Sequence, residues 1–153
     1  MRDVRVTVLG TAQDGGVPQP GCARECCLRV RANDALRRHP VSLGIVGSDG
    51  SAHLIEASRS IGEQFEIWHS VDPVEGALSS LSITHAHLGH VDGLGLFGKE
   101  AMGANHLTLH CSESFAALIE NNPPWHDLRE QEVIIPKVWT SDEAFEPSSG
   151  CGF

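Results

Sequence analysis

The sequence predicts a layered α/β domain, and three observations support this prediction. Near the N-terminus, short runs alternate apolar and polar residues with the period of two that is typical of strands. Further along, strand-like runs alternate with segments whose apolar residues recur at helical spacing. The chain has 153 residues, 41% of them apolar, which is enough for one domain with a buried core. Strands first, followed by alternating helices and strands, is an order that favours a layered α/β domain.

The first predicted elements are strands around a loop rich in glycine and proline. Val4–Gly10 alternates at period two and reads as a strand, and the loop continues to Cys22. Two apolar runs, 41–47 and 52–57, are separated by the letters "SDGS", whose Asp-Gly step favours a tight turn. We therefore expect these two runs to form a β-hairpin.

A helix and a strand are predicted next. Ser58 or Ser60 can cap a helix in which Ile61, Phe65 and Trp68 recur at helical spacing, so these three side chains should pack against the sheet. The run "ALSSLSITHA" then reads as a strand that enters a cluster of histidines.

The second half of the chain continues the alternation. Segment 90–104 places Val91, Leu94 and Met102 on one face of a predicted helix, and 106–111 is a strand. Segment 112–122 is a helix with Ser112 as N-cap, which "NNPP" should end, and 132–139 is a further strand. From Ser141 onward the chain has no period and little to bury. We therefore expect one domain over 1–140 and a disordered tail over 141–153.

Charge and hydropathy exclude several classes of partner. The formal net charge is −9, so the chain lacks the basic patch expected of a protein that binds nucleic acid or an anionic membrane. No apolar stretch approaches the roughly 18 residues that span a bilayer. The N-terminus lacks the apolar core of a signal peptide, which predicts a cytoplasmic location. In that compartment the 5 cysteines indicate metal ligands or free thiols rather than disulfides.

Three closely spaced histidines, His85, His87 and His90, form the strongest candidate site. If the preceding strand continues through Thr84, His85 and His87 project to the same side, and His90 follows after a turn through Gly89. Imidazole is a good ligand for zinc, and loops between rigid elements are where α/β proteins place chemistry. The spacing predicts a metal site; the alternative is a histidine-rich surface turn.

The run "THAHLGH" resembles the H-x-H-x-D-H signature of the metallo-β-lactamase superfamily, with Gly89 in place of the Asp. Together with "VLGTAQDGGVPQPGCAREC" and "HLIEASRSIGEQF", it is similar to proteins grouped with the pyrroloquinoline quinone biosynthesis protein B. The likeness extends from Val4 to about Pro136. The resemblance implies that His85 and His87 bind a first metal and that His90 contributes to a second. Because the carboxylate is absent at Gly89, we expect one active-site ion, with zinc favoured and iron or manganese as alternatives.

The N-terminal cysteines form a second candidate site. Cys22, Cys26 and Cys27 lie in one short segment, and thiolates at this density suit a structural zinc if a fourth ligand comes from elsewhere. The segment resembles the cysteine loop of the phosphoribosyl cyclic phosphodiesterases of the same superfamily. The alternative is that these thiols are free and pack as small apolar groups.

Three weaker candidates have ordinary structural explanations as well. His106 and His110 share one strand face and could approach a site, or they could cover a half-exposed sheet. Asp14 could line the mouth of the site or favour the turn that contains it.

The sequence therefore predicts a metal-dependent, hydrolase-like protein in which a metal-activated water attacks a phosphodiester or ester of a small-molecule substrate. The resemblance also implies a first alternative, an oxidative or carrier step in the biosynthesis of a quinone cofactor. The second alternative is a non-catalytic metal-binding protein, which the missing carboxylate favours.

The resemblance also implies an αβ/βα sandwich of two similar halves, of which we expect this chain to be the N-terminal half and, by itself, to be inactive or nearly so. One face of its sheet should then be uncovered, so a second copy or a companion chain should cover it.

Overall fold

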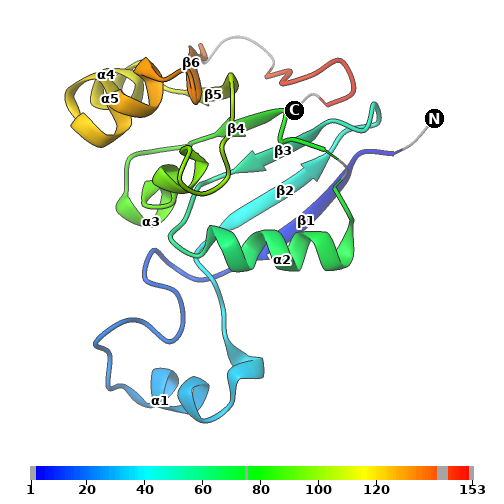
Figure 1. The fold of residues 1–153 in the computed structure, drawn as a ribbon. Helices are drawn as coiled ribbons and strands as arrows, with labels where there is room; N and C mark the ends of the chain where they lie inside the picture. Colours follow the sequence, from blue (N-terminus) through cyan, green and yellow to red (C-terminus); the bar gives the residue numbers. More distant parts are fainter. Residues whose placement is uncertain (1–2, 75, 141–144, 152–153) are drawn as a thin grey trace.

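A computed structural model of the chain describes residues 3–74, 76–140 and 145–151. One sheet of six strands, in the order β1-β2-β3-β4-β5-β6, runs through it (Figure 1). The strands are β1 (Arg5–Gly10), β2 (Ser42–Val46), β3 (Ala52–Ile55), β4 (Ser80–Ser82), β5 (Leu107–Cys111) and β6 (Ile134–Val138).

The direction of the strands changes once along this sheet. β1, β2 and β3 pair in antiparallel fashion, and the predicted hairpin joins β2 to β3. β3, β4, β5 and β6 pair in parallel. Parallel strands need crossover connections, which the helices provide here. The carboxyl ends of β3, β4 and β5 consequently meet at one edge of the sheet.

Helices fill the connections between the strands. They are α1 (Glu25–Ala32), α2 (Ile61–Val71), α3 (Leu88–Val91), α4 (Glu113–Asn121) and α5 (Pro123–Glu130), with short 3₁₀ helices η1 (Asp34–Leu36) and η2 (Leu94–Phe97). The predicted N-cap of α4 is confirmed, because the Ser112 hydroxyl accepts a hydrogen bond of 3.2 Å from the Phe115 N–H. Within the described residues, no helix is both long and apolar enough to cross a membrane.

Two predicted elements have the wrong extent, and one helix, α5, was not predicted. Segment 90–104 is not one helix but the end of α3 followed by η2, and Met102 is 45% exposed. The glycines in this segment explain the break, because each weakens a helix by about 1 kcal/mol relative to alanine. The "NNPP" sequence ends α4, but its prolines also begin α5, since proline suits the first turn of a helix. β4 ends at Ser82, before the histidines.

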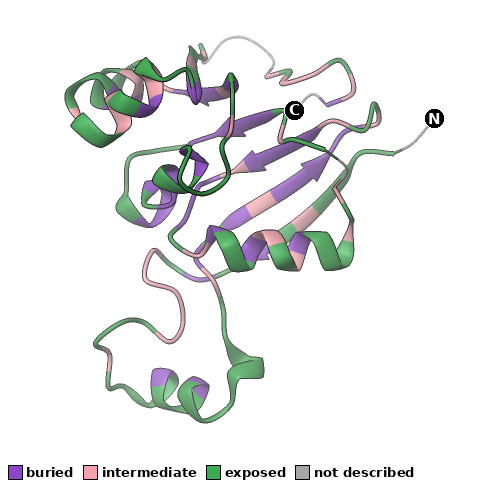
Figure 2. Cartoon of the chain, in the orientation of Figure 1, coloured by how far each residue is buried: buried purple, intermediate pink, exposed green. Residues whose placement is uncertain are grey.

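The core lies between the sheet and its helices, as Figure 2 shows by burial. Leu54, Leu81 and Leu109 lie in register on β3, β4 and β5 and are at most 1% exposed. Ile61 and Trp68 of α2 are buried as predicted, and Phe65 is partly buried against them. This packing fixes the parallel part of the sheet and therefore the edge at which its strands end.

Two segments lie outside that core. The chain between β1 and β2 extends away from the sheet and carries α1 at its far end (Figure 1). Of the segment expected to be a disordered tail, residues 145–151 are described and contact the β2–β3 turn. Gly150, for example, accepts a hydrogen bond of 3.0 Å from the Ser48 N–H. Residues 141–144 and 152–153 lie outside the described part.

Candidate metal centre

Three elements bring polar side chains to one edge of the sheet. Glu56 directly follows β3, His85 lies in the loop after β4, and His90 belongs to α3. Since β3 and β4 are parallel, their carboxyl ends lie side by side at this edge. In α/β proteins this is the usual place for a binding site.

Backbone hydrogen bonds hold α3 against the end of β3. The Ala57 N–H donates to the His90 carbonyl at 2.8 Å, and the Gly93 N–H donates to the Ala57 carbonyl at 2.8 Å. A Cβ at position 93 would lie 2.1 Å from the Ser58 carbonyl oxygen, so only glycine permits this approach. The ring of His90 is thereby fixed beside Glu56.

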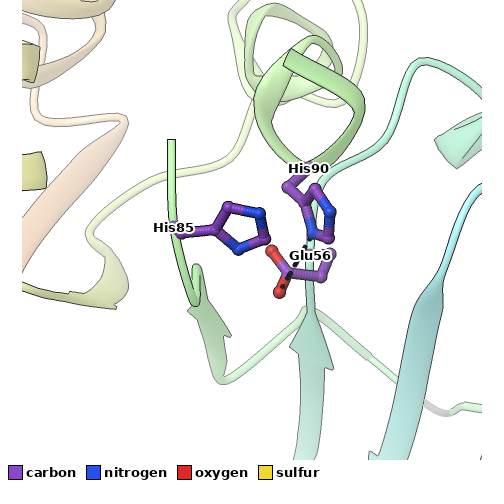
Figure 3. A group of neighbouring side chains, drawn as sticks. All are labelled: Glu56, His85 and His90. Carbon is purple, nitrogen blue, oxygen red and sulfur yellow. Dashed lines mark ion pairs between the residues drawn. The ribbon is translucent and has the colours of Figure 1, made fainter. Parts of the chain in front are cut away.

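The side chains of Glu56, His85 and His90 converge (Figure 3). Each offers one ligand atom, and the three atoms lie within 4.8 Å of one another. The ring centroids of His85 and His90 are 4.1 Å apart. No other group of three or more His, Cys, Asp or Glu side chains meets this spacing in the part of the chain that the structure describes.

Glu56 is a buried carboxylate whose charge lacks a conventional partner. Its side chain is 4% exposed, and the Thr84 hydroxyl and, at 3.4 Å, the Thr84 N–H donate hydrogen bonds to it. Among the described residues no Lys or Arg pairs with it. Its one ion-pair contact is His90 Nδ1, 3.3 Å from Oε1, yet that nitrogen has no hydrogen-bond partner. A buried carboxylate needs a compensating charge, and a bound cation would provide it.

The hydrogen bonds around Thr84 orient His85. An ionised carboxylate accepts only, so the Thr84 hydroxyl proton goes to Glu56. The hydroxyl oxygen, 2.8 Å from His85 Nδ1, then accepts the Nδ1 proton. In the neutral imidazole this assignment leaves Nε2 of His85 with a free lone pair, and the lone pair is what binds a metal.

His87 and Asp14 lie beside this group, nearer the surface. The His87 side chain is 73% exposed, and its ring centroid is 4.5 Å from that of His85. Asp14 lies 3.8 Å from His87 Nδ1 and 3.6 Å from His90 Nε2. Asp14 also occupies a turn, since the Gly16 N–H donates to the Gln13 carbonyl at 2.8 Å. Asp14 therefore lies both beside the histidines and in a turn, the two positions that the sequence offered as alternatives.

The structure does not bring the three N-terminal cysteines together as a ligand group. Cys27 is buried, Cys26 is exposed and Cys22 is intermediate. The sulfur atoms of Cys26 and Cys27 are 4.0 Å apart, and Cys27 accepts a contact of 3.4 Å from the Gln19 N–H. All three lie in the segment that carries α1, away from the sheet (Figure 1).

The remaining candidate histidines lie away from the centre. His106 is exposed and pairs with Glu132 at 3.4 Å. His110 is buried in β5 against the ring of Phe145, and burial lowers its pKa. The cavity of ≈ 570 Å³ between α2 and the segment after η2, lined by Phe65, Trp68 and Phe97 among others, contains none of the histidines of the centre.

The donors at the sheet edge fit a divalent metal. Two imidazoles and a carboxylate are a ligand set that zinc, iron and manganese accept. His90 Nδ1 is buried without a hydrogen-bond partner, and a metal ion would satisfy its lone pair. His85 and His87 are exposed, so this side of the site faces solvent. Sequence reasoning found the histidines but missed Glu56, although an acidic residue directly after a buried strand was a signal available in "HLIEA".

The sequence is similar to curated proteins named coenzyme PQQ synthesis protein B, although no family model matches it. It is 32% identical over 148 residues to the coenzyme PQQ synthesis protein B of Bradyrhizobium diazoefficiens, covering 94% of this chain and 47% of that protein. It is 29% identical to the protein of the same name from Rhizobium meliloti, covering 97% and 49%. The chain thus spans about half the length of the curated relatives it matches.

Solved structures show the same fold. Zn²⁺-bound PqqB from Methylobacterium extorquens superposes with a TM-score of 0.80 at 26% identity, over 95% of this chain and 49% of that one. A diphosphatase from the PhnP family gives a TM-score of 0.69 at 24% identity, over 100% and 56%. A metallo-β-lactamase-fold protein, YhfI from Bacillus subtilis, gives 0.59 at 13% identity, over 94% and 48%.

Proposed function

With the metallo-β-lactamase fold and the similarity to coenzyme PQQ synthesis protein B as premises, we propose that this chain carries the metal site of a hydrolase-like protein. The observation that carries the proposal is the convergence of Glu56, His85 and His90 at one sheet edge. Zinc is the favoured ion, since a solved relative is Zn²⁺-bound.

Each side chain has a distinct role in this proposal. His85 and His90 would hold the ion, and His87, whose side chain is 73% exposed, lies beside them. Glu56 supplies the buried negative charge, and through Thr84 it keeps Nε2 of His85 available. A divalent metal held there would supply Lewis-acid chemistry: it would lower the pKa of a bound water to about 7 and polarise the substrate oxygen. The phosphodiester or ester substrate would approach from the solvent-exposed side of the centre, where His85 and His87 lie.

Turnover of bis(4-nitrophenyl) phosphate and 4-nitrophenyl acetate tests this function. We expect zinc- or manganese-dependent release of 4-nitrophenolate that is slow for the chain by itself and absent from a His85→Ala/His90→Ala variant. Equal rates for the two proteins would contradict a hydrolytic role for this site. Metal binding without turnover of either substrate would favour the non-catalytic alternative.

A second candidate function is a step in the biosynthesis of pyrroloquinoline quinone. The sequence relatives favour it, because the curated proteins that this chain matches bear that name. An oxidative step would need a redox-active metal such as iron, which the same ligand set accepts. Competition between Fe²⁺ and Zn²⁺ under anaerobic conditions, followed by titration with the quinone, tests this role. Exclusive zinc binding and no quinone binding would contradict it.

We further propose that a second copy of the chain covers the open side of the sheet. Val6 and Val8 of β1 and the preceding Val4 are 58%, 56% and 48% exposed, and exposed apolar residues on an edge strand favour association with another chain. Size-exclusion chromatography with light scattering should give the mass of a dimer. The mass of a stable monomer would contradict this proposal. Copurification with a different chain would mean that this other chain, rather than a second copy, covers the sheet.

A further inference from the structure

Gly89 occupies the motif position at which the resemblance leads us to expect a carboxylate, and the structure shows what fills the space beside it. A Cβ built on Gly89 would lie 2.3 Å from both Cα and Cβ of Asp14 and 2.7 Å from its Cγ. The side chain of Asp14, from the loop after β1, therefore begins where a side chain at position 89 would begin.

The carboxylate of Asp14 faces two histidines of the centre. Oδ1 lies 3.6 Å from His90 Nε2, and Oδ2 lies 3.8 Å from His87 Nδ1. Both distances are too long for hydrogen bonds. They are shorter than about 4.2 Å, which is the sum of a zinc–oxygen and a zinc–nitrogen bond. The spacing thus suits ligands that share an ion better than groups that bond directly.

The surroundings of Asp14 give its charge no other partner. In the described part of the chain, its ion-pair contacts are His87 and His90, and no Lys or Arg pairs with it. Asp92 lies two residues beyond His90 in the sequence. Its carboxylate pairs with Arg59 at 2.6 Å. Asp14 is therefore the carboxylate available on the open side of the centre.

We propose that Asp14 supplies the carboxylate ligand that the histidine motif lacks at Gly89, and that it binds metal together with His90 and His87. This inference rests on the proposed metal centre. It also explains the glycine, because any side chain at position 89 would displace Asp14 from the histidines.

Zinc titration of the metal-free full chain tests the proposal. Asp14→Asn preserves the shape of the side chain and removes its charge, and we expect about a 10- to 100-fold loss of affinity, as is typical of changes around metal ligands. Asp14→Glu, which restores the charge, should bind more tightly than Asp14→Asn. Asp92→Asn is the matched control, since it removes an equal charge nearby, and it should bind as the wild type does.

A second variant moves Asp14 without changing it. Gly89→Ala places a methyl group in contact with Asp14 and should weaken zinc binding to a similar extent. Gly95→Ala is its control, because a Cβ there meets no atom within 4 Å. The visible spectrum of bound Co²⁺ should change in Asp14→Asn and in Gly89→Ala but not in the controls. A purely structural role of Asp14 would leave this spectrum unchanged.

The outcomes separate this inference from the metal centre itself. If His85→Ala/His90→Ala binds zinc as tightly as the wild type, the centre is wrong and the role of Asp14 falls with it. If that variant loses zinc while Asp14→Asn and Gly89→Ala keep the wild-type affinity and Co²⁺ spectrum, the centre stands and Asp14 is not a ligand.

Discussion

The histidine centre and the cysteine segment have similar densities of metal-binding residues in the sequence, but the fold treats them differently. Glu56, His85 and His90 come from three elements that the core holds in register, and their ligand atoms lie within 4.8 Å of one another. Cys22, Cys26 and Cys27 come from one local segment that extends from the sheet, and no such group forms there among the described residues.

This difference shows that a preorganised site requires rigid support as well as suitable ligands. The centre is backed by Ile83 and Val91, which are 0% exposed. Residues 31–38 at the end of the cysteine segment are all exposed, and α1 buries only Cys27 and Val30. A zinc ion that binds the cysteines would therefore have to bring its ligands together, at a cost in free energy. At the histidine centre the fold already holds the ligands close to one another.

The largest expected effect comes from removing both imidazoles of the converging group. His85→Ala/His90→Ala should weaken zinc binding by more than about 100-fold. Substitutions of residues that only support metal ligands reduce affinity by up to about 100-fold, and removing two ligands should cost more. Zinc content after dialysis, with far-UV circular dichroism to check the fold, is the measurement. His69→Ala/His126→Ala removes two histidines away from the centre and should retain wild-type zinc content; a loss there would contradict the assignment.

A smaller effect is expected from neutralising the buried carboxylate. Glu56→Gln should weaken zinc binding by about 10- to 100-fold. It should not destabilise the metal-free chain, because it removes a buried charge that lacks a Lys or Arg partner among the described residues. Calorimetric titration and the Tm without metal check both parts. Glu66→Gln, on the exposed side of α2, is the control. A lower Tm without metal would mean that Glu56 serves packing rather than a cation.

The smallest effect is expected at the cysteines, where the structural zinc remains a prediction. Cys22→Ser or Cys26→Ser should lower both the zinc content and the Tm, by about 2–4 °C for each 1 kcal/mol of lost binding free energy in a chain of this length. Metal analysis and thermal unfolding with and without chelator provide the test. Unchanged zinc content and Tm would leave these thiols as ordinary packing residues.

Most of the fold could be predicted because its elements are locally encoded. The alternation in Val4–Gly10 and the N-cap at Ser112 each correspond to an observed element. The errors occurred where two local signals compete. In "NNPP" the prolines both stop one helix and start the next. In segment 90–104 the glycines override the apolar spacing, and η2 forms instead of a continued helix.

The site could be predicted only in part, since its ligands are brought together by pairing between strands. The histidines share one short run of sequence, so their proximity was readable, although His85 and His87 follow β4 rather than extending it. Glu56 lies far from them along the chain and reaches them through the pairing of β3 with β4. Asp14 approaches Gly89 from the loop after β1, a contact that only the folded structure reveals.

X-ray absorption at the zinc K-edge, on the chain loaded with one equivalent of zinc, tests the central claim most directly, because nitrogen and oxygen ligands differ from sulfur in bond length. We predict a first shell of nitrogen and oxygen at about 2.0–2.2 Å, with imidazole scattering that is lost in His85→Ala/His90→Ala. A dominant sulfur shell at about 2.3 Å would place the tightly bound ion at the cysteines and contradict the account.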